Sequence, residues 1–383
     1  MFLALRDLRF ATGRFALMGS VVALISLLLV MLSGLTAGLG GQNTAAIDRL
    51  GEQGVQRLVF GGAAGQEPTA SFTQSEFTVA QRDAWAATDG VASVEPLGVS
   101  QGRAIGLEHP VDTDPQGRAD VSGEPTTGVA TTAFIGLTPG GSDAPAGVEP
   151  GQIVLSQDVA DSLHAQEGDA VAVSGFVYTV ADVVPTEYYS HSPVTWLALE
   201  DWNAISHTAD DAVLGTAGLV RFDAGADVDA VAAAGDDAAG TVAETVKGSY
   251  AALPSYRSEN SSLMTMQGFL YGISALVVIA FLSIWTVQRT RDIAVLKALG
   301  GSNGWVLKDS LAQAAFVLVG GVAVGTGLAA VIGAFAGRAV PFELSWATTA
   351  VPAAGVLVLG MLAAVIAVYR VTRIDPLVAL GGN

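Results

Sequence analysis

Four apolar stretches, each long enough to cross a lipid bilayer as a helix, constrain this sequence more than any other feature. They cover residues 15–39, 263–287, 311–337 and 345–369. The hydrocarbon core of a bilayer needs about 20 apolar residues in a helix that rises about 1.5 Å per residue. The first stretch also exceeds the roughly 7–15 apolar residues of a cleaved secretory signal. We therefore expect four transmembrane helices, the first of which stays in the membrane.

The charged residues are divided between the segments that separate these stretches. The protein has 383 residues, no cysteine and a formal net charge of −18. Residues 40–262 hold 31 Asp and Glu against 8 Lys and Arg, whereas residues 1–14, 288–310 and 370–383 are basic in sum. Basic segments tend to remain on the cytoplasmic side of a membrane. The sequence therefore predicts a cell-membrane protein with a large acidic domain outside the cell and both termini in the cytoplasm.

Residues 40–262 are expected to fold as an α+β domain without disulfides. Strand patterns cover residues 55–60, 91–100, 152–155, 171–174, 176–184, 194–199 and 214–222. Helices are expected from the capping residue Thr78 through Thr88, from Ser156 through His164, and over the acidic residues 227–246, broken or weakened at Gly235 and Gly240. The predicted fold class is an α-helical membrane protein with four transmembrane helices plus an α+β extracellular domain inserted between helices 1 and 2.

The remaining segments are short. Residues 1–14 carry Arg6, Arg9 and Arg14 beside apolar side chains and predict a cytoplasmic amphipathic helix on the membrane surface. Residues 338–344 form an outer loop. Glycines four residues apart, at Gly34 and Gly38, Gly321 and Gly325, and Gly333 and Gly337, predict close helix packing.

The cytoplasmic segment 288–310 carries an ordered set of side chains. Ile293, Leu296 and Leu299 recur every three residues, which gives a helix one apolar face, and a double glycine then ends that helix. The resemblance described next implies that a cytoplasmic partner meets Arg289, Arg291, Asp292, Ile293, Leu296, Lys297, Leu299 and Gly300, with Arg373, Asp375 and Pro376 from the tail 370–383.

In its order of residues this segment resembles the coupling segment of the permeases related to FtsX and to the macrolide exporter MacB. Gln288 and Asp292 stand where those permeases usually have glutamate. The tail resembles the terminal motif of the same permeases at Arg370, Arg373, Ile374, Asp375, Pro376, Ala379 and Leu380. The resemblance implies a homodimer of this permease with two cytoplasmic ATPase subunits, which press on the segment and drive motion through it.

The sequence lacks the residue patterns of a catalyst. It contains no G-x-x-x-x-G-K-[ST], H-E-x-x-H or G-x-S-x-G motif, so we expect no enzyme activity, no intrinsic cofactor or metal, and ATP bound only by the partner. No ionisable side chain lies deep in the four stretches, which argues against ion-driven transport. The acidic outer domain argues against a nucleic-acid partner.

Short matches at residues 5–10, 34–39 and Asn43 resemble the HrtB-type haem-exporter permeases. This resemblance implies haem as the transported substrate, held between the outer halves of the first two transmembrane helices. Glu259 or Met31 would lie nearest the iron, and Arg257 and Asn260 would meet the propionates. The other candidates are Met264, Met266, Tyr188, Tyr189, His191 and Tyr250, and each of them also has an ordinary packing interpretation.

Three alternatives stay open on the sequence. The same architecture suits an FtsX-like transducer that regulates an extracellular cell-wall hydrolase, or an exporter of another hydrophobic compound or peptide. A passive membrane-anchored scaffold is the third. A scaffold would tolerate changes in the segment 288–310, whereas the other two would not.

Overall fold

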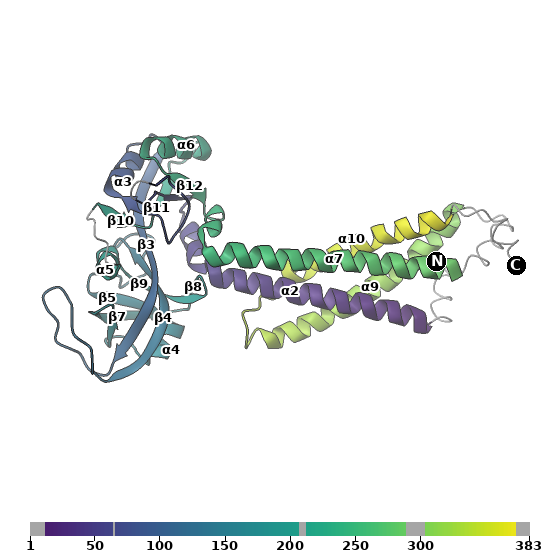
Figure 1. The fold of residues 1–383 in the computed structure, drawn as a ribbon, viewed down its shortest axis with the longest axis horizontal. Coiled ribbons are helices and arrows are strands. Elements are labelled where there is room, and N and C mark those ends of the chain that lie inside the picture. Colours follow the sequence, from purple (N-terminus) through teal and green to yellow (C-terminus); the bar gives the residue numbers. More distant parts are fainter. Residues whose placement is uncertain (1–11, 64–65, 207–211, 289–302, 373–383) are drawn as a thin grey trace, which may run out of the picture. The chain divides into compact units, whose positions relative to one another are not determined.

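The computed structural model describes residues 12–63, 66–206, 212–288 and 303–372. The chain divides into two compact units. The helical unit comprises Met1–Leu39 and Asn260–Asn383, and the β-rich unit comprises Gly40–Glu259. Helices α2 (Thr12–Glu52) and α7 (Pro254–Gln288) each run without interruption through residues of both units (Figure 1).

The β-rich unit is built on one long strand that serves two sheets. In chain order its strands and helices are β1 (Arg57–Phe60), β2 (Phe77–Thr78), α3 (Val79–Ala86), β3 (Val91–Leu107), β4 (Thr126–Leu137), β5 (Gln152–Ser156), α4 (Gln157–Leu163), β6 (Ala170–Val173), β7 (Phe176–Val184), β8 (Tyr188–Tyr189), β9 (Ser192–Ala198), α5 (Leu199–Ile205), β10 (Val213–Gly215), β11 (Ala217–Phe222), α6 (Val228–Ala239), β12 (Val242–Thr245) and the 3-10 turn η1 (Gly248–Ala252). Strand β3 pairs with β11 through its first half and with β4 through its second half.

The first sheet has the strand order β12-β1-β11-β3, and all of its pairings are antiparallel. The chain visits it as β1-α3-β3 and then β11-α6-β12, which is the split arrangement of ferredoxin-like domains. Helices α3 and α6 cover one face (Figure 1), and their core includes Trp85, Phe77 and Phe222. A Cβ at Gly235 in α6 would lie 2.5 Å from the ring of Trp85, so this glycine admits the indole rather than weakening the helix.

The second sheet closes on itself. Its order β3-β4-β9-β5-β7-β6 returns to β3, because Ala104–Gly106 of β3 also pair with β6. Two of its pairings, β4 with β9 and β5 with β7, are parallel. Closure leaves no unpaired edge among these six strands, and a second core around Phe134, Trp202 and Ile153 fills the space against α4 and α5.

The sequence located most of these elements but missed or misplaced several. The hairpin at Gly175 and the capping box of Thr78 and Gln81 are confirmed. Strand β4 was not predicted, and β3 continues to Leu107 rather than ending near residue 100. These two stretches pair mainly with each other across the long connection 108–125, and their alternation is diluted by glycine and threonine.

Two helix predictions were wrong in detail. Ser156 stands at the N-cap position of α4, but its hydroxyl donates to the carbonyl of Val194 instead of capping the helix. The acidic helix expected over residues 227–246 does not extend to Val246. It ends at Gly240, one of the two glycines predicted to break or weaken it, which adopts a left-handed φ of 60°, and the chain then forms β12.

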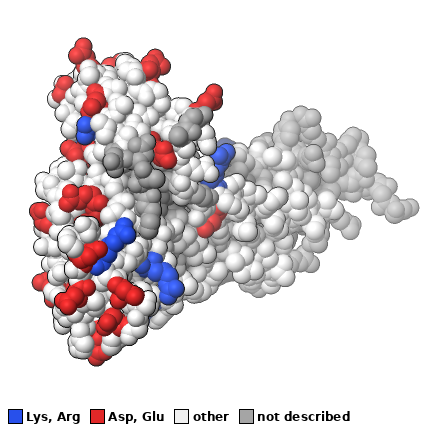
Figure 2. Space-filling model, turned by 60° about the vertical axis from the view of Figure 1, so that its left-hand side comes forward, with Lys and Arg blue, Asp and Glu red and all other residues white. Residues whose placement is uncertain are grey.

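The helical unit contains residues of four helices that are long and apolar enough to cross a membrane by length and composition: α2, α7, α9 (Asn303–Ala336) and α10 (Trp346–Thr372). Apart from the residues drawn in grey, the helical unit shows few charged side chains in Figure 2, whereas acidic side chains are scattered over the β-rich unit. Helix α2 continues past the predicted limit at residue 39, and its last turns belong to the β-rich unit.

Helices α2 and α9 pack closely through the glycines of α9. A Cβ at Gly325 would lie 2.2 Å from the carbonyl oxygen of Ala23, and the hydroxyls of Ser26 and Thr326 lie 3.2 Å apart across the contact. The predicted close packing at Gly321 and Gly325 is therefore confirmed.

The glycines Gly34 and Gly38 of α2 receive a loop rather than a helix. The ring of Phe342 lies against Gly34 on one side and Gly333 of α9 on the other, so that a Cβ at either glycine would come within 2.4 Å of the ring. The carbonyl of Pro341 lies against Gly38, and the Glu343 N–H donates to the Gly34 carbonyl at 3.0 Å. The expectation of close helix–helix packing at Gly34 and Gly38 was wrong because the outer loop occupies that surface.

The segments 1–11, 289–302 and 373–383 lie outside the described residues. The predicted amphipathic helix, the coupling residues Arg289–Gly300 and the tail residues Arg373, Asp375 and Pro376 therefore stay predictions.

The α2–α9 contact predicts a position-specific effect of adding one methyl group. Gly325→Ala places a Cβ against backbone that cannot yield, and we expect a loss of about 1–3 kcal/mol, seen as a lower unfolding temperature in detergent. Gly327 is the matched control, because a Cβ there meets no atom within 4 Å. Gly327→Ala is expected to be neutral or stabilising, since alanine favours helix. Equal unfolding temperatures for the two variants would contradict this packing.

Candidate functional site

A two-residue turn between β8 and β9 is the centre of the candidate site. Tyr189 pairs with Ser192, which leaves Ser190 and His191 as the turn, and both have left-handed backbones with φ of 47° and 63°. Hairpin turns of this kind normally use Asn-Gly because side chains with a Cβ are disfavoured there. Each of the two residues stores strain on the order of 1–3 kcal/mol, so surrounding contacts must hold the turn in place.

Those contacts come from three elements. The Ser190 N–H donates to the Asn43 carbonyl at 3.0 Å, and the His191 N–H donates to the Gln42 carbonyl at 2.9 Å, both within α2. The Gln101 amide of β3 donates to the Ser190 carbonyl at 3.3 Å. The hydroxyls of Ser190 and of Ser255 in α7 lie 3.3 Å apart. The turn is thereby fixed against both long helices and the sheet.

The imidazole of His191 bridges the two helices. Its Nε2 lies 3.1 and 2.9 Å from the two carboxylate oxygens of Glu259 in α7. Asn43 Nδ2 of α2 donates to Glu259 Oε2 at 3.2 Å and lies 3.0 Å from His191 Nε2. The carboxylate of Glu259 is satisfied when Asn43 Nδ2 and His191 Nε2 both carry hydrogen and both donate to it. We call Asn43, His191 and Glu259 the junction cluster; the side chains of His191 and Glu259 are 31% and 40% exposed, so both remain reachable.

The end of α2 is anchored further along by polar and apolar contacts. Tyr250 donates its phenol hydrogen to Asp48, which also accepts from Thr44 at 2.9 Å. Arg49 lies 3.5 Å from the carboxylate of Glu187. Burial raises the pKa of Glu187, and this effect outweighs the nearby charge of Arg49, which lowers the pKa. Ala46, Ile47 and Leu50 are buried in the main core of the β-rich unit.

The three candidate tyrosines hold their protons firmly. The hydrogen bond that Tyr188 donates to Asp158 is the main cause that raises the Tyr188 pKa to about 12. Burial raises the pKa of Tyr189, which is 3% exposed and packs on Phe72, and it also raises the pKa of Tyr250. A phenolate ligand at neutral pH would have to overcome these shifts, so the tyrosines serve packing and hydrogen bonding in this conformation.

The helical unit holds the methionine candidates. Met31 is half-buried in α2, whereas Met264 and Met266 in α7 are 62% and 55% exposed. The Gln267 amide of α7 donates to the Thr36 hydroxyl of α2 at 3.2 Å, so these two helices are in contact within this unit. Arg257 is exposed and Asn260 is half-exposed, both on α7.

The structure therefore brings together His191 and Glu259 among the predicted candidates and adds Asn43 as their shared neighbour. Asn43 entered the sequence reasoning only as part of a resemblance, and Asp48, Ser190 and Ser255 were missed. Serine and histidine in a turn carry no recognisable turn signal, and the tertiary contacts that hold the turn cannot be read from local spacing. Among the described residues, no three His, Asp or Glu side chains gather as a metal site would require.

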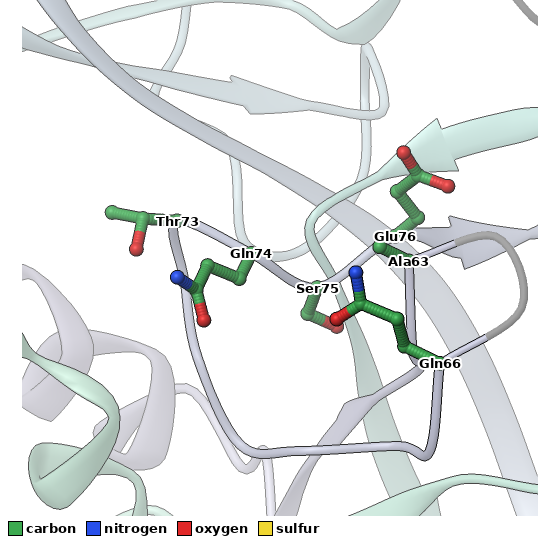
Figure 3. A pocket seen from close by; sticks show the side chains of 6 residues that line it. All are labelled: Ala63, Gln66, Thr73, Gln74, Ser75 and Glu76. Atoms are coloured by element: carbon green, nitrogen blue, oxygen red, sulfur yellow. The ribbon is translucent and has the colours of Figure 1, made fainter.

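A separate hollow of about 330 Å³ lies in the loop between β1 and β2. It is lined by Ala63, Gln66, Thr73, Gln74, Ser75 and Glu76 (Figure 3). Its wall is polar and none of the predicted candidates lines it, so it takes no part in the candidate site.

The family comparison covers the part of the chain that contains α9, α10 and most of α7. A family model described as FtsX-like permease C-terminal matches residues 264–376. The match begins within α7, at Met264, and includes all of α9 and α10. The predicted resemblance to FtsX-like ABC transporter permeases is confirmed.

Two relatives carry the same protein name. The hemin transport system permease protein HrtB of Staphylococcus epidermidis (strain RP62A) is 21% identical over 385 aligned residues, which cover 100% of both chains. HrtB of Staphylococcus haemolyticus (strain JCSC1435) is 29% identical over 130 residues, 34% of this chain and 37% of that one. The extracellular domain of the ABC-type transporter YknZ from Gram-positive bacteria aligns with a TM-score of 0.32 and 14% identity over 49% of this chain and 95% of its own.

The tyrosine environments predict that alkali weakens the β-rich unit. A phenol whose pKa is raised on folding stabilises the fold fully below its unfolded pKa of 10.0, and for Tyr188 this contribution is lost as the pH rises through about 12. We expect the unfolding temperature, followed by circular dichroism, to fall over that interval, and Tyr188→Phe to fall less steeply. Identical pH profiles for the variant and the native protein would contradict the role of Tyr188.

Proposed function

We propose that this protein is the permease subunit of an ATP-driven exporter that removes haem from the membrane through mechanical coupling to a separate ATPase. The observation that carries the mechanical part is the continuity of α2 and α7. Each helix begins or ends among the packed residues of the β-rich unit and continues as an apolar helix of the helical unit. A hydrogen-bonded helix is stiff along its axis, so a displacement at one end reaches the other.

The energy for this motion is proposed to enter from the cytoplasm. The basic segment 288–310 follows α7 directly, and its apolar residues Ile293, Leu296 and Leu299 offer a face to an ATPase subunit. The acidic β-rich unit then lies outside the cell, with both termini inside. No nucleotide-binding motif is present in the sequence, so ATP is bound by the partner.

A homodimer is proposed on the surface of α7. Exposed apolar side chains follow one another at three- or four-residue spacing over much of that surface, namely Met266, Phe269, Ile273 and Leu276. This is the seam that a second copy of the same helix would cover. In this proposal, two permeases pair with two ATPase subunits.

Haem is the proposed substrate because the relatives named above are hemin transport permeases and one of them aligns over the whole chain. Haem is flat and amphiphilic and partitions into lipid, so an entrance between α2 and α7 within the helical unit avoids a passage through water. Glu259 or Met31 is the proposed iron contact, with Arg257 and Asn260 for the propionates. Carboxylate and thioether groups suit iron better at neutral pH than the firmly protonated tyrosines.

The coupling proposal predicts the effect of charges on the apolar face of the cytoplasmic segment. Ile293→Asp, Leu296→Asp and Leu299→Asp in one chain should abolish co-purification of the ATPase, since desolvating three carboxylates at an interface is unfavourable. Val129→Asp is the control, because Val129 is apolar and 43% exposed in β4. Retained co-purification together with full transport by the triple variant would rule out this route of coupling.

The substrate proposal predicts saturable haemin binding. Purified protein titrated with haemin should show a shift of the Soret band, and Met31→Ala combined with Glu259→Ala should weaken binding about tenfold or more and alter the spectrum. Leu276→Ala, a truncation of an exposed α7 side chain, should leave the titration unchanged. An unchanged spectrum and affinity in the double variant would exclude these two ligands, whereas a native protein that binds no haemin would favour the transducer that regulates a hydrolase.

A further inference from the structure

We propose that His191 is a releasable clasp on Glu259: the carboxylate is bound either by the imidazole or by an incoming cationic ligand such as haem iron, and never by both. Substrate arrival would then detach the first turns of α7 from the β8–β9 turn. This inference rests on the proposed function only for the identity of the ligand.

The geometry of the carboxylate carries the exclusion. His191 Nε2 lies within hydrogen-bonding distance of both oxygens of Glu259, at 3.1 and 2.9 Å, and therefore sits between them. In that position the imidazole covers the inner lone pair of each oxygen, which is the lone pair that a metal ion ordinarily takes when it binds a carboxylate through one oxygen or through both. Asn43 Nδ2 engages Oε2 from α2 as well, at 3.2 Å. An iron atom that takes the carboxylate in this way displaces the imidazole.

The backbone of the turn makes release local. His191 and Ser190 are held to α2 by their N–H groups, which donate to the carbonyls of Gln42 and Asn43. Loss of the imidazole contact leaves these bonds intact, so the turn stays on α2 while the second turn of α7 loses its bond to the turn; Tyr256 still packs against the core in the first turn. On the α7 side, the Ser190–Ser255 hydroxyl contact of 3.3 Å is long and weak.

The strain of the turn fits a clasp better than a passive loop. Two consecutive residues with a Cβ are kept in the left-handed region, where glycine would fold without strain. The conformation places the imidazole over Glu259, a result that Asn-Gly at the same positions would not give. Strained backbone of this kind is typical of sites whose geometry serves function.

The clasp connects substrate occupancy to the moving part of the molecule. Glu259 lies in the second turn of α7, and the same helix continues to Gln288, directly before the cytoplasmic segment. When Glu259 leaves His191, the first turns of α7 are held by fewer contacts. Whether Glu259 binds the imidazole or the ligand therefore affects how α7 can move, and this motion reaches the proposed ATPase contact along the helix.

The rival interpretation is a brace, in which His191 holds Glu259 in the rotamer that binds iron. The two interpretations predict opposite signs. Removing the imidazole frees the carboxylate if His191 is a clasp and raises affinity for haemin, whereas it disorders the carboxylate if His191 is a brace and lowers that affinity.

The test uses the full-length protein in lipid nanodiscs and two matched variants of the turn. Asparagine tolerates the left-handed backbone, so His191→Asn removes the imidazole and Ser190→Asn keeps it. Haemin affinity is measured from the Soret band, and hydrogen exchange is measured by mass spectrometry on residues 254–262. Asn43→Ala, which removes the second donor, is the supporting variant.

We expect His191→Asn to bind haemin about tenfold more tightly and to exchange faster over residues 254–262 without ligand. Ser190→Asn should resemble the native protein in haemin affinity and should exchange more slowly than His191→Asn, and Asn43→Ala should show a smaller gain in affinity. Haemin added to the native protein should raise exchange over residues 254–262 to the level of His191→Asn, in which it adds nothing further.

Two outcomes overturn the clasp: an equal or lower haemin affinity in His191→Asn, or native protein that binds haemin with unchanged exchange over residues 254–262. These results leave haem export itself standing. A native protein without saturable haemin binding overturns the proposed substrate. In that case, a faster exchange in His191→Asn than in Ser190→Asn still supports the conclusion that the imidazole holds the first turns of α7 in place.

Discussion

Because a bilayer offers no partner for backbone N–H and C=O groups, the chain can cross it only with those groups paired internally, and here that means helices. Two of these helices do not end where the apolar residues end. Helix α2 continues to Glu52 and α7 begins at Pro254, so both carry the same hydrogen-bonded backbone into the β-rich unit. The proposed mechanical coupling depends on this continuity, since a flexible linker at either place would transmit no displacement.

The two helices are joined differently in each unit. Within the helical unit the Gln267 amide of α7 donates to the Thr36 hydroxyl of α2. Within the β-rich unit the junction cluster adds a carboxylate and an imidazole, which are the groups that respond to a cation. The end of α2 is further fixed by Asp48 and by its buried apolar residues, and Tyr256 in the first turn of α7 packs against the same core.

Glycine spacing illustrates how far local sequence reaches. Gly321 and Gly325 meet α2 directly, and Gly34 and Gly38, with the same spacing, receive Phe342 and Pro341 of the outer loop. The spacing predicts that another segment packs closely against the helix, because a missing Cβ leaves room on one face. It does not predict whether that segment is a helix or a loop, since both need the same gap.

By itself, the sequence determined the four apolar helices, the acidic character of the large domain between the first two of them, and the resemblance to FtsX-like permeases. These features depend on composition and on the order of residues along the chain. It also located the Thr78 cap and the hairpin at Gly175, which depend on residues a few positions apart. Only the tertiary structure decided the closure of the second sheet through β3 and β6, and the meeting of Asn43, His191 and Glu259. Those contacts join residues more than sixty positions apart, and their geometry depends on packing that no local pattern records.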